Sequence, residues 1–458
     1  MHGPAIRKWI LVILALAAGA ALRIEFLRTH PEIGFDALRY GDIARNWITH
    51  GIYGLSSFDA SGGLRIHPTL LRLPGYPLFL ALCFSLFGME HYMAGMRVQV
   101  VLDLVSCLLI AGFVRRVVSP RAGMIALFLA ALCPFTANYT ASPLTESLSI
   151  FCVALAMYSF ARLVESRRPL FVVILAFAFS YAALLRPDGA LVGIAFCPAI
   201  FLYGRRTWGS FHALKMAVVC GLLAILPFIP WTVRNWHTFH VFQPLAPRYA
   251  TDPGEFIDIG FIQWTKTWCA EFTSTSEIYW NADSDKMDVN NLPSRAFDSP
   301  AQRDETSSIF DAYNEKTTVG PDIDSRFQAL AQERIHAHPL RYYVQLPLLR
   351  VADMWLRPRL EMMWFELRWW QYAQHHDETI KAWAYAALNF AYLLLALIGM
   401  LRWPRFSGVM LVFILLRSGL LATVEAPEPR YTLECFPMVI AWASVALSRR
   451  RAGDSGKG

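Results

Sequence analysis

Ten long apolar segments run through this 458-residue chain, and they constrain its fold more than any other feature. A helix that crosses a bilayer needs about 20 mainly apolar residues. The composition agrees, because 55% of the residues are hydrophobic and only 17% are charged, whereas soluble proteins carry about 25% charged residues. The predicted spans are residues 9–27, 93–114, 122–137, 144–163, 170–185, 190–203, 213–231, 382–401, 407–424 and 433–447. We therefore expect an all-α polytopic membrane protein with about ten transmembrane helices.

Short cationic clusters predict the orientation of these spans, because positive charge is retained on the cytoplasmic side of a membrane. With a cytoplasmic amino terminus, ten spans place every such cluster inside. These clusters are Arg7-Lys8, Arg115-Arg116 with Arg121, Arg167-Arg168, Arg205-Arg206, Arg402 with Arg405, and Arg449-Arg450-Arg451. An eleventh apolar run, 76–87, would cover only about 18 Å as a helix, and counting it as a span would move most clusters outside. We interpret it as a half-buried helix on the outer face.

This topology divides the chain into four parts. We expect a membrane domain over 1–231 with its active site on the first outer loop, 29–92, and an extracytoplasmic insertion over 232–381. Carboxyl-terminal spans over 382–448 and a cytoplasmic tail over 449–458 follow. The insertion is acidic, rich in Trp and helix-like at 324–336 and 340–356, and its aromatic content suggests that it packs onto the membrane surface. The basic excess elsewhere signals orientation, so no nucleic-acid partner is expected.

Carboxylates stand out at two places on the outer face. Asp36 and Tyr40 are four residues apart, a spacing that puts both side chains on one face of a short helix. Glu146 begins a later span from the same side. The alternatives are a solvated loop residue for Asp36 and a helix-capping role for Glu146. Ionisable groups at membrane depth are costly and usually functional, which favours a site.

Three arginines lie at outer-face junctions, where cations are disfavoured. Arg72 and Arg186 stand beside Pro-Gly and Pro-Asp-Gly turns, and Arg430 precedes the last span. The alternative for each is snorkelling towards lipid head groups. Arginine suits a bidentate grip on phosphate oxygens, so a phosphate-bearing lipid is the expected ligand. Histidines such as His336 and His338 lack a third metal ligand at a recognised spacing, and neither a metal nor a cofactor is predicted.

These motifs together resemble a known family. Asp36-x-x-x-Tyr40-x-x-x-Ala44, then Gly51-Ile-Tyr53 and Arg72-Leu-Pro-Gly-Tyr76-Pro, resemble the first outer loop of GT-C glycosyltransferases. The bacterial subgroup is the one related to protein O-mannosyltransferases and lipid A aminoarabinose transferases. Further landmarks of that subgroup match Leu144-Thr-Glu146, Leu185-Arg-Pro-Asp-Gly189, Pro230-Trp-x-x-Arg234-Asn235 and Pro429-Arg430-Tyr431. The resemblance covers roughly residues 5–240 and 380–447. The sequence departs from the family pattern at Ala37, where many relatives have a second acid. It also departs at Arg72-Leu-Pro, which stands where the aminoarabinose transferases have a Lys-Pro-Pro motif.

The resemblance implies a membrane glycosyltransferase that moves a sugar from a polyprenyl-phosphate donor to an acceptor hydroxyl or amine, with inversion. The acceptor would be a glycan, lipid or protein, and the site would face the periplasm from the bacterial inner membrane. Asp36 would be the catalytic base and Glu146 the second acid. Substrate contacts would come from Tyr40, Arg72, Tyr76, Arg186, Arg234 and Arg430. The alternatives are a transporter or lipid flippase, whose broken midplane helices and repeats are not evident here, and a non-catalytic scaffold.

Overall fold

The computed structural model describes residues 3–58, 62–371 and 376–448, and the chain divides into two compact units. The membrane unit comprises Met1–Pro253, Phe390–Leu416 and Leu433–Gly458. The insertion unit comprises Gly254–Asn389 and Arg417–Thr432. It therefore begins later than the expected insertion 232–381 and also includes the outer end of the last helix pair. The expected cytoplasmic tail, 449–458, lies outside the described residues.

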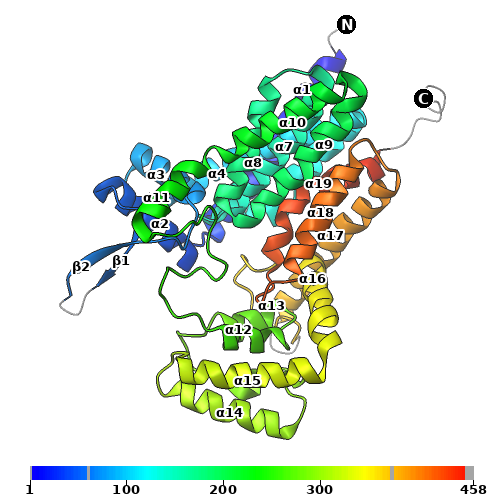
Figure 1. The fold of residues 1–458 in the computed structure, drawn as a ribbon. Helices are drawn as coiled ribbons and strands as arrows, with labels where there is room; N and C mark the ends of the chain where they lie inside the picture. Colours follow the sequence, from blue (N-terminus) through cyan, green and yellow to red (C-terminus); the bar gives the residue numbers. More distant parts are fainter. Residues whose placement is uncertain (1–2, 59–61, 372–375, 449–458) are drawn as a thin grey trace. The chain divides into compact units, whose positions relative to one another are not determined.

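The membrane unit is built from helices (Figure 1). They are α1 (Gly3–Thr29), α2 (Phe35–His50), α3 (Gly75–Phe87), α4 (Tyr92–Val117), α5 (Pro120–Ala131), α6 (Pro134–Ala137), α7 (Glu146–Ser166), α8 (Leu170–Leu185), α9 (Ala190–Trp208), α10 (Ser210–Ile225), α11 (Phe228–Phe239) and α19 (Phe436–Leu447). Helices α17 (His376–Leu401) and α18 (Ser407–Leu421) run through both units. Helix α4 packs against α5 and α7, α7 packs against α8, and α9 packs against α10.

The predicted spans all fall on these helices, and the polytopic all-α prediction is confirmed. Six helices in the described part of the chain are long and apolar enough to cross a membrane, and a bent pair, Pro120–Ala131 and Pro134–Ala141, makes a seventh. Predicted spans 170–185 and 407–424 correspond to the shorter apolar helices α8 and α18, and span 433–447 corresponds to α19. The ambiguous run 76–87 forms α3, a short apolar helix.

A buried ion pair supports the bend between α5 and α6. Pro134 has no N–H, so the carbonyl of Ala130 cannot receive its usual helical hydrogen bond. Arg23 of α1, fully buried, donates to the carbonyl oxygens of Ala131 (2.7 Å) and Ala130 (3.5 Å). Its charge is balanced by Asp103 of α4, which accepts from Arg23 Nε at 2.6 Å. The bend carries the chain towards Glu146 at the start of α7.

The first outer loop consists of α2, a β-hairpin and the turn that leads into α3. Gly51 ends α2 in the left-handed conformation (φ 69°), and its N–H donates to the carbonyl of Trp47, which is a common helix ending. Strands β1 (Gly54–Phe58) and β2 (Leu64–Pro68) pair antiparallel, with Gly54 opposite Pro68. Asp42 of α2 accepts from the Ser56 amide at 2.6 Å and fixes the base of the hairpin. The hairpin was not predicted from the sequence.

The insertion unit is a small helical body with an aromatic core. Its helices are α12 (Ile259–Lys266), α13 (Phe272–Ser274), α14 (Pro300–Asn314), α15 (Pro321–Ala337) and α16 (Leu346–Leu356), with a π-helical turn at Arg341–Gln345. Trp264, Trp268 and Phe327 are fully buried where α12 packs on α15. The predicted helical stretches 324–336 and 340–356 are confirmed.

Candidate active site

Asp36 and Arg72 form an ion pair on the first outer loop. Asp36 lies in the first turn of α2, where a negative charge is favoured by the helix dipole. Arg72 Nη2 donates to Asp36 Oδ1 at 2.5 Å. The two side chains are 20% and 33% exposed, so the pair is reachable from solvent. The Tyr53 hydroxyl donates to the backbone carbonyl of Arg72 at 2.9 Å and fixes the turn that carries the arginine.

Two tyrosine rings lie beside this pair. The Arg72 guanidinium carbon is 5.7 Å from the centroid of the Tyr40 ring, close enough for a cation–π interaction. The Tyr40 and Tyr76 rings meet edge to face at 4.9 Å. The Tyr76 hydroxyl donates to Gln99 Oε1 at 2.5 Å, and the Gln99 amide donates onward to the carbonyl of Ser142 at 2.8 Å. Tyr76 is therefore held in place by the segment that precedes α7.

The electrostatic surroundings of Tyr40 show that four charged side chains converge on it. Burial raises the pKa of the Tyr40 phenol above its ordinary value. The positive charges of Arg72 and Arg186 oppose this shift, and the carboxylates of Asp36 and Glu146 reinforce it. A phenol feels charges strongly only when they are near in a poorly solvated environment. The structure thus brings together the first-loop residues and those from the start of α7 and the end of α8.

Arg186 is surrounded by three carboxylates. Its Nη1 lies 3.3 Å from Glu146 Oε1, and its Nε lies 3.2 Å from Asp188 Oδ1 and 3.8 Å from Glu434 Oε1. Glu146 and Glu434 are each 3% exposed. The sequence analysis missed Asp188 and Glu434. Glu434 was detectable, because it is a carboxylate at the start of the last apolar segment, the same signal that identified Glu146.

Close backbone packing joins the Arg72 turn to the Arg186 turn. Gly75, at the start of α3, lies so near to α8 that a Cβ there would be 2.6 Å from the carbonyl of Leu184. The Tyr181 hydroxyl also donates to the Gly75 carbonyl at 3.1 Å. Gly189 is equally constrained, since its Cβ would lie 2.1 Å from the Ala182 carbonyl oxygen. Glycine at position 75 lets the Arg72 turn approach α8, and glycine at position 189 lets the Arg186 turn fold back against the end of α8.

Arg234 is engaged by the first outer loop. It donates to the backbone carbonyls of Tyr53 (2.6 Å) and Thr69 (2.9 Å). Its guanidinium carbon also lies 5.2–5.3 Å from the ring centroids of Tyr53, Trp231 and Phe239. These contacts tie α11 to both ends of the β-hairpin.

Arg430 belongs to the insertion unit. Its Nη2 donates to Glu428 Oε1 at 3.1 Å, and the Tyr431 hydroxyl donates to the same oxygen at 2.5 Å. The arginine side chain is 18% exposed. Within the described ranges 3–58, 62–371 and 376–448, no three His, Cys, Asp or Glu residues gather in a way that could hold a metal ion.

The fold is that of a polytopic membrane protein, and the chain is similar to enzymes of the GT-C type. Residues 67–231 match the family model of dolichyl-phosphate-mannose-protein mannosyltransferases, a range that includes Arg72, Glu146 and Arg186 and begins after Asp36. No curated protein matches the sequence. The GT-C resemblance seen in the sequence is confirmed.

The chain is also similar to solved structures of two other proteins. One is the archaeal oligosaccharyltransferase AglB from Archaeoglobus fulgidus in complex with an inhibitory peptide and a dolichol-phosphate. It has a TM-score of 0.51 and 13% identity, over 96% of this chain and 50% of that chain. The Archaeoglobus fulgidus oligosaccharyltransferase tethered with an acceptor peptide gives a TM-score of 0.52 and 12% identity, over 96% of this chain and 49% of that chain. ArnT from Cupriavidus metallidurans bound to undecaprenyl phosphate gives a TM-score of 0.38 and 15% identity, over 95% of this chain and 76% of that chain. This chain thus spans about half the length of AglB.

Proposed function

We propose that this protein is a membrane glycosyltransferase that transfers a sugar from a polyprenyl-phosphate donor to an acceptor hydroxyl or amine, with Asp36 as the general base. One observation carries the proposal. Asp36 pairs with Arg72 and Glu146 pairs with Arg186, the Arg72 guanidinium lies over the Tyr40 ring, and the charges of all four side chains act on the Tyr40 phenol. Two arginines at such a site suit an anionic lipid phosphate. The dolichol-phosphate bound to AglB, which shares the fold, supports this ligand class.

The reaction requires one proton transfer and one displacement. The acceptor O–H or N–H gives its proton to the Asp36 carboxylate, and the acceptor atom forms a bond to the anomeric carbon of the sugar. The bond between that carbon and the phosphate oxygen breaks, and polyprenyl phosphate departs as an anion. Because the phosphate leaves readily without protonation, a general acid is dispensable. Direct displacement inverts the anomeric centre, and a positioned base contributes about 10²–10⁴-fold.

The ion pair between Arg72 and Asp36 gives this base a way to become available. With no donor bound, the Asp36 carboxylate accepts a hydrogen bond from the guanidinium of Arg72 at 2.5 Å. A donor phosphate competes with Asp36 for the same arginine, since arginine binds both groups in the same bidentate manner. Donor binding would then free Asp36 to accept the acceptor proton. Arg72 would stabilise the negative charge that develops on the departing phosphate.

The remaining site residues take supporting roles in this proposal. Arg186, between its carboxylates, would make a second phosphate contact, and Glu146 would orient it. Tyr40 and Tyr76 would form the wall against which the donor packs. Arg234 would act as a positioning residue, because its donors already serve carbonyls of the first outer loop. Arg430 stays a candidate substrate contact.

We place the reaction on the periplasmic face of the bacterial inner membrane. The support is the distribution of cationic clusters, which all fall on the cytoplasmic side when the first span begins inside. A reporter fused near Ser284 of the insertion unit should be active only outside the cytoplasm. Activity only in the cytoplasm would overturn this topology and the outer-face site with it.

A transfer assay separates this function from the flippase alternative. The full chain would be reconstituted in liposomes with a panel of radiolabelled undecaprenyl-phosphate sugars, and release of undecaprenyl phosphate would be measured beside movement of intact lipid across the bilayer. We expect release by the wild type and little or none by Asp36→Asn. Lipid movement without any cleavage, in both proteins, would contradict the glycosyltransferase assignment.

A further inference from the structure

One helical stretch of the insertion unit buries charged side chains and exposes large apolar ones, which is unusual for a surface helix. It runs without interruption from Pro339 to Leu356, first through the π-helical turn Arg341–Gln345 and then through α16. Pro347 lacks an N–H and cannot complete a regular α-helical ladder, and the wider turn just before it accommodates that loss.

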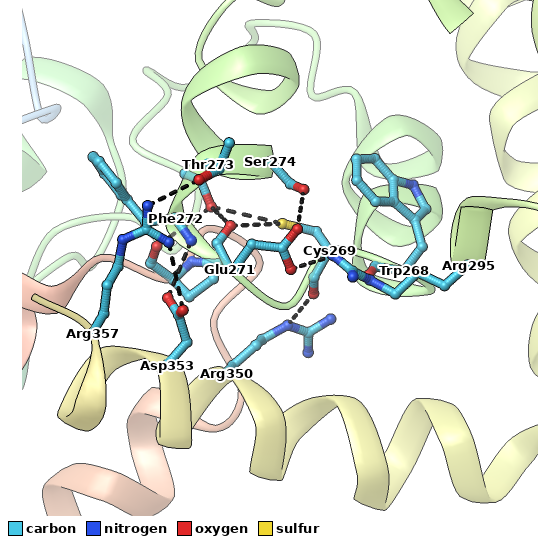
Figure 2. Close-up of polar contacts among 12 residues, drawn as sticks. Trp268, Cys269, Glu271, Phe272, Thr273, Ser274, Arg295, Arg350, Asp353 and Arg357 are labelled. Atoms are coloured by element: carbon cyan, nitrogen blue, oxygen red, sulfur yellow. Dashed lines mark hydrogen bonds and ion pairs between the residues drawn. The ribbon is translucent and has the colours of Figure 1, made fainter. Parts of the chain in front are cut away.

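The face of this helix that is turned into the protein carries charged side chains beside the apolar Leu346 and Met354. Arg350 is 1% exposed, and its Nε donates to the carbonyl of Cys269 at 2.9 Å. Asp353, one turn further on, accepts from the amide of Phe272 at 3.2 Å. Arg357, just beyond the end of α16, hydrogen-bonds to the residue that follows Phe272. Figure 2 shows these three side chains pointing at the stretch that runs from Cys269 into α13.

The opposite face is exposed and mainly apolar, and Gln345 is the polar side chain exposed among residues 343–349. Leu340, Val344 and Leu348 recur at intervals of four residues, which places them along one side of a helix. The exposed side chains on this face are Leu340 (71%), Tyr343 (67%), Val344 (46%), Leu348 (64%), Leu349 (53%) and Leu356 (58%). A helix at a protein–water boundary normally shows the reverse arrangement, with its apolar stripe buried. A continuous exposed apolar stripe marks a surface that another apolar phase covers.

Two hydrogen bonds fix the position of the carboxyl-terminal end of this helix along α17 and α18, and so its depth in the membrane. The backbone carbonyl of Trp355 accepts from Asn389 of α17 at 2.8 Å, and Trp355 Nε1 donates to Ser418 of α18 at 3.1 Å. Helix α17 is long and apolar enough to cross a membrane. Asn389 lies eight residues past Lys381, the last charged residue of its outer half, which is about 12 Å of helix. Trp355 therefore lies beside the apolar part of a span.

Exposed tryptophans occur in the same part of the insertion unit. Trp364, Trp370 and Trp383 are 58%, 46% and 63% exposed, and all three lie between the end of α16 and the apolar part of α17. Tryptophan is enriched at the boundary between lipid and water, where an amphipathic ring is stable. These side chains indicate the level of a membrane interface.

We propose that the apolar face of residues 339–356 lies within one leaflet of the bilayer, in contact with lipid acyl chains. Amphipathic helices of this kind bury their apolar face about 5–10 Å into the interface. The depth set by Trp355 and the neighbouring tryptophans favours lipid over a second copy of the chain or a bound acceptor. The leaflet is the outer one if the topology proposed above holds.

Site-directed spin labelling of the full chain in phospholipid nanodiscs tests this proposal. Labels would be attached at Leu348→Cys and Leu356→Cys, with Ala329→Cys on the exposed face of α15 as the matched control. The eight native cysteines are buried or half-buried, and labelling of the wild type measures their background. Collisions of each label with oxygen, which concentrates in lipid, would be compared with collisions with a water-soluble nickel complex.

We expect collisions with oxygen to exceed collisions with the nickel complex at residues 348 and 356. The excess should be larger at residue 356, because that end of the helix lies deeper in the bilayer. At residue 329 collisions with the nickel complex should exceed those with oxygen. Nickel access at residue 348 equal to that at residue 329 would place the helix in water and overturn the proposal. Protection from both reagents would show that protein covers the face, and that result would also overturn it. No donor is needed, so this outcome is independent of the transfer assay.

Discussion

The two arginines of the candidate site have different surroundings. Arg72 pairs with Asp36, and both side chains are partly exposed. Arg186 lies among three carboxylates, of which Glu146 and Glu434 are buried. A partly exposed ion pair exchanges partners at little cost, whereas removing one member of a buried group leaves an uncompensated charge. This difference is why we propose proton transfer for the Asp36–Arg72 pair and orientation of the donor for the Arg186 cluster.

The largest expected effect is on turnover when Asp36 loses its charge. Asp36→Asn keeps the size of the side chain but cannot accept a proton, so turnover should fall by about 10² or more. Glu90→Gln is the matched control, because Glu90 also pairs with an arginine of the first outer loop, Arg45, at 2.8 Å. That variant should retain near-normal turnover. Equal losses in both variants would mean that any ion pair on this loop matters only for folding.

A smaller loss is expected when Arg72 is replaced. Hydrogen bonds to charged groups contribute about 1.5–3 kcal/mol, so Arg72→Ala should weaken donor binding by roughly 10–100-fold. The donor affinity of Arg72→Lys should lie between those of the wild type and Arg72→Ala, since the ammonium group of lysine is a point charge and the guanidinium of arginine is a planar fork. Arg45→Lys serves as the control. Wild-type donor affinity in both Arg72→Ala and Arg186→Ala would show that the phosphate is bound elsewhere.

The Arg186 cluster should tolerate the loss of one carboxylate better than the first-loop pair does. Glu146→Gln and Glu434→Gln each leave two acids beside Arg186, so each should lower turnover by roughly tenfold or less. The double variant should lose more than the two single effects combined, because the residues share one partner. A loss in Glu146→Gln as large as that in Asp36→Asn would mean that the two acids share the role of base.

The smallest expected effect concerns Tyr40. Because burial raises the pKa of its phenol above the ordinary value of about 10, the hydroxyl stays protonated through pH 9. Turnover of Tyr40→Phe should therefore change by only about twofold, and its pH profile between pH 6 and 9 should keep the wild-type shape. An alkaline limb that is present in the wild type and absent in Tyr40→Phe would show that the tyrosine titrates in this range.

Hydropathy and charge were sufficient to predict the polytopic helical fold, the short apolar helix α3 and the grouping of Asp36 with Arg72, because these depend on local pattern. The β-hairpin was not predictable in this way. Its strands are five residues each, and an isolated hairpin of this size is marginal in water. It depends on Asp42 of α2, a tertiary contact.

Partners distant in sequence explain the other omissions. Glu434 was included in an apolar segment, because its compensating partner, Arg186, lies 248 residues earlier. Arg234 was predicted as a substrate contact from a family motif, and the motif does not show that Arg234 also donates to the backbone carbonyls of Tyr53 and Thr69. The sequence likewise predicts a helix over 340–356 without indicating that Arg350 is buried.

Equilibrium binding of undecaprenyl phosphate to the full chain tests the exchange between Asp36 and Arg72 most directly. Wild type, Asp36→Asn and Arg72→Ala would be compared in the same nanodiscs. If the donor phosphate competes with Asp36 for Arg72, Asp36→Asn should bind the lipid at least as tightly as the wild type, while Arg72→Ala binds at least about tenfold more weakly. Folded Asp36→Asn protein that binds as weakly as Arg72→Ala would contradict this account, because the carboxylate would then support phosphate binding and not compete with it.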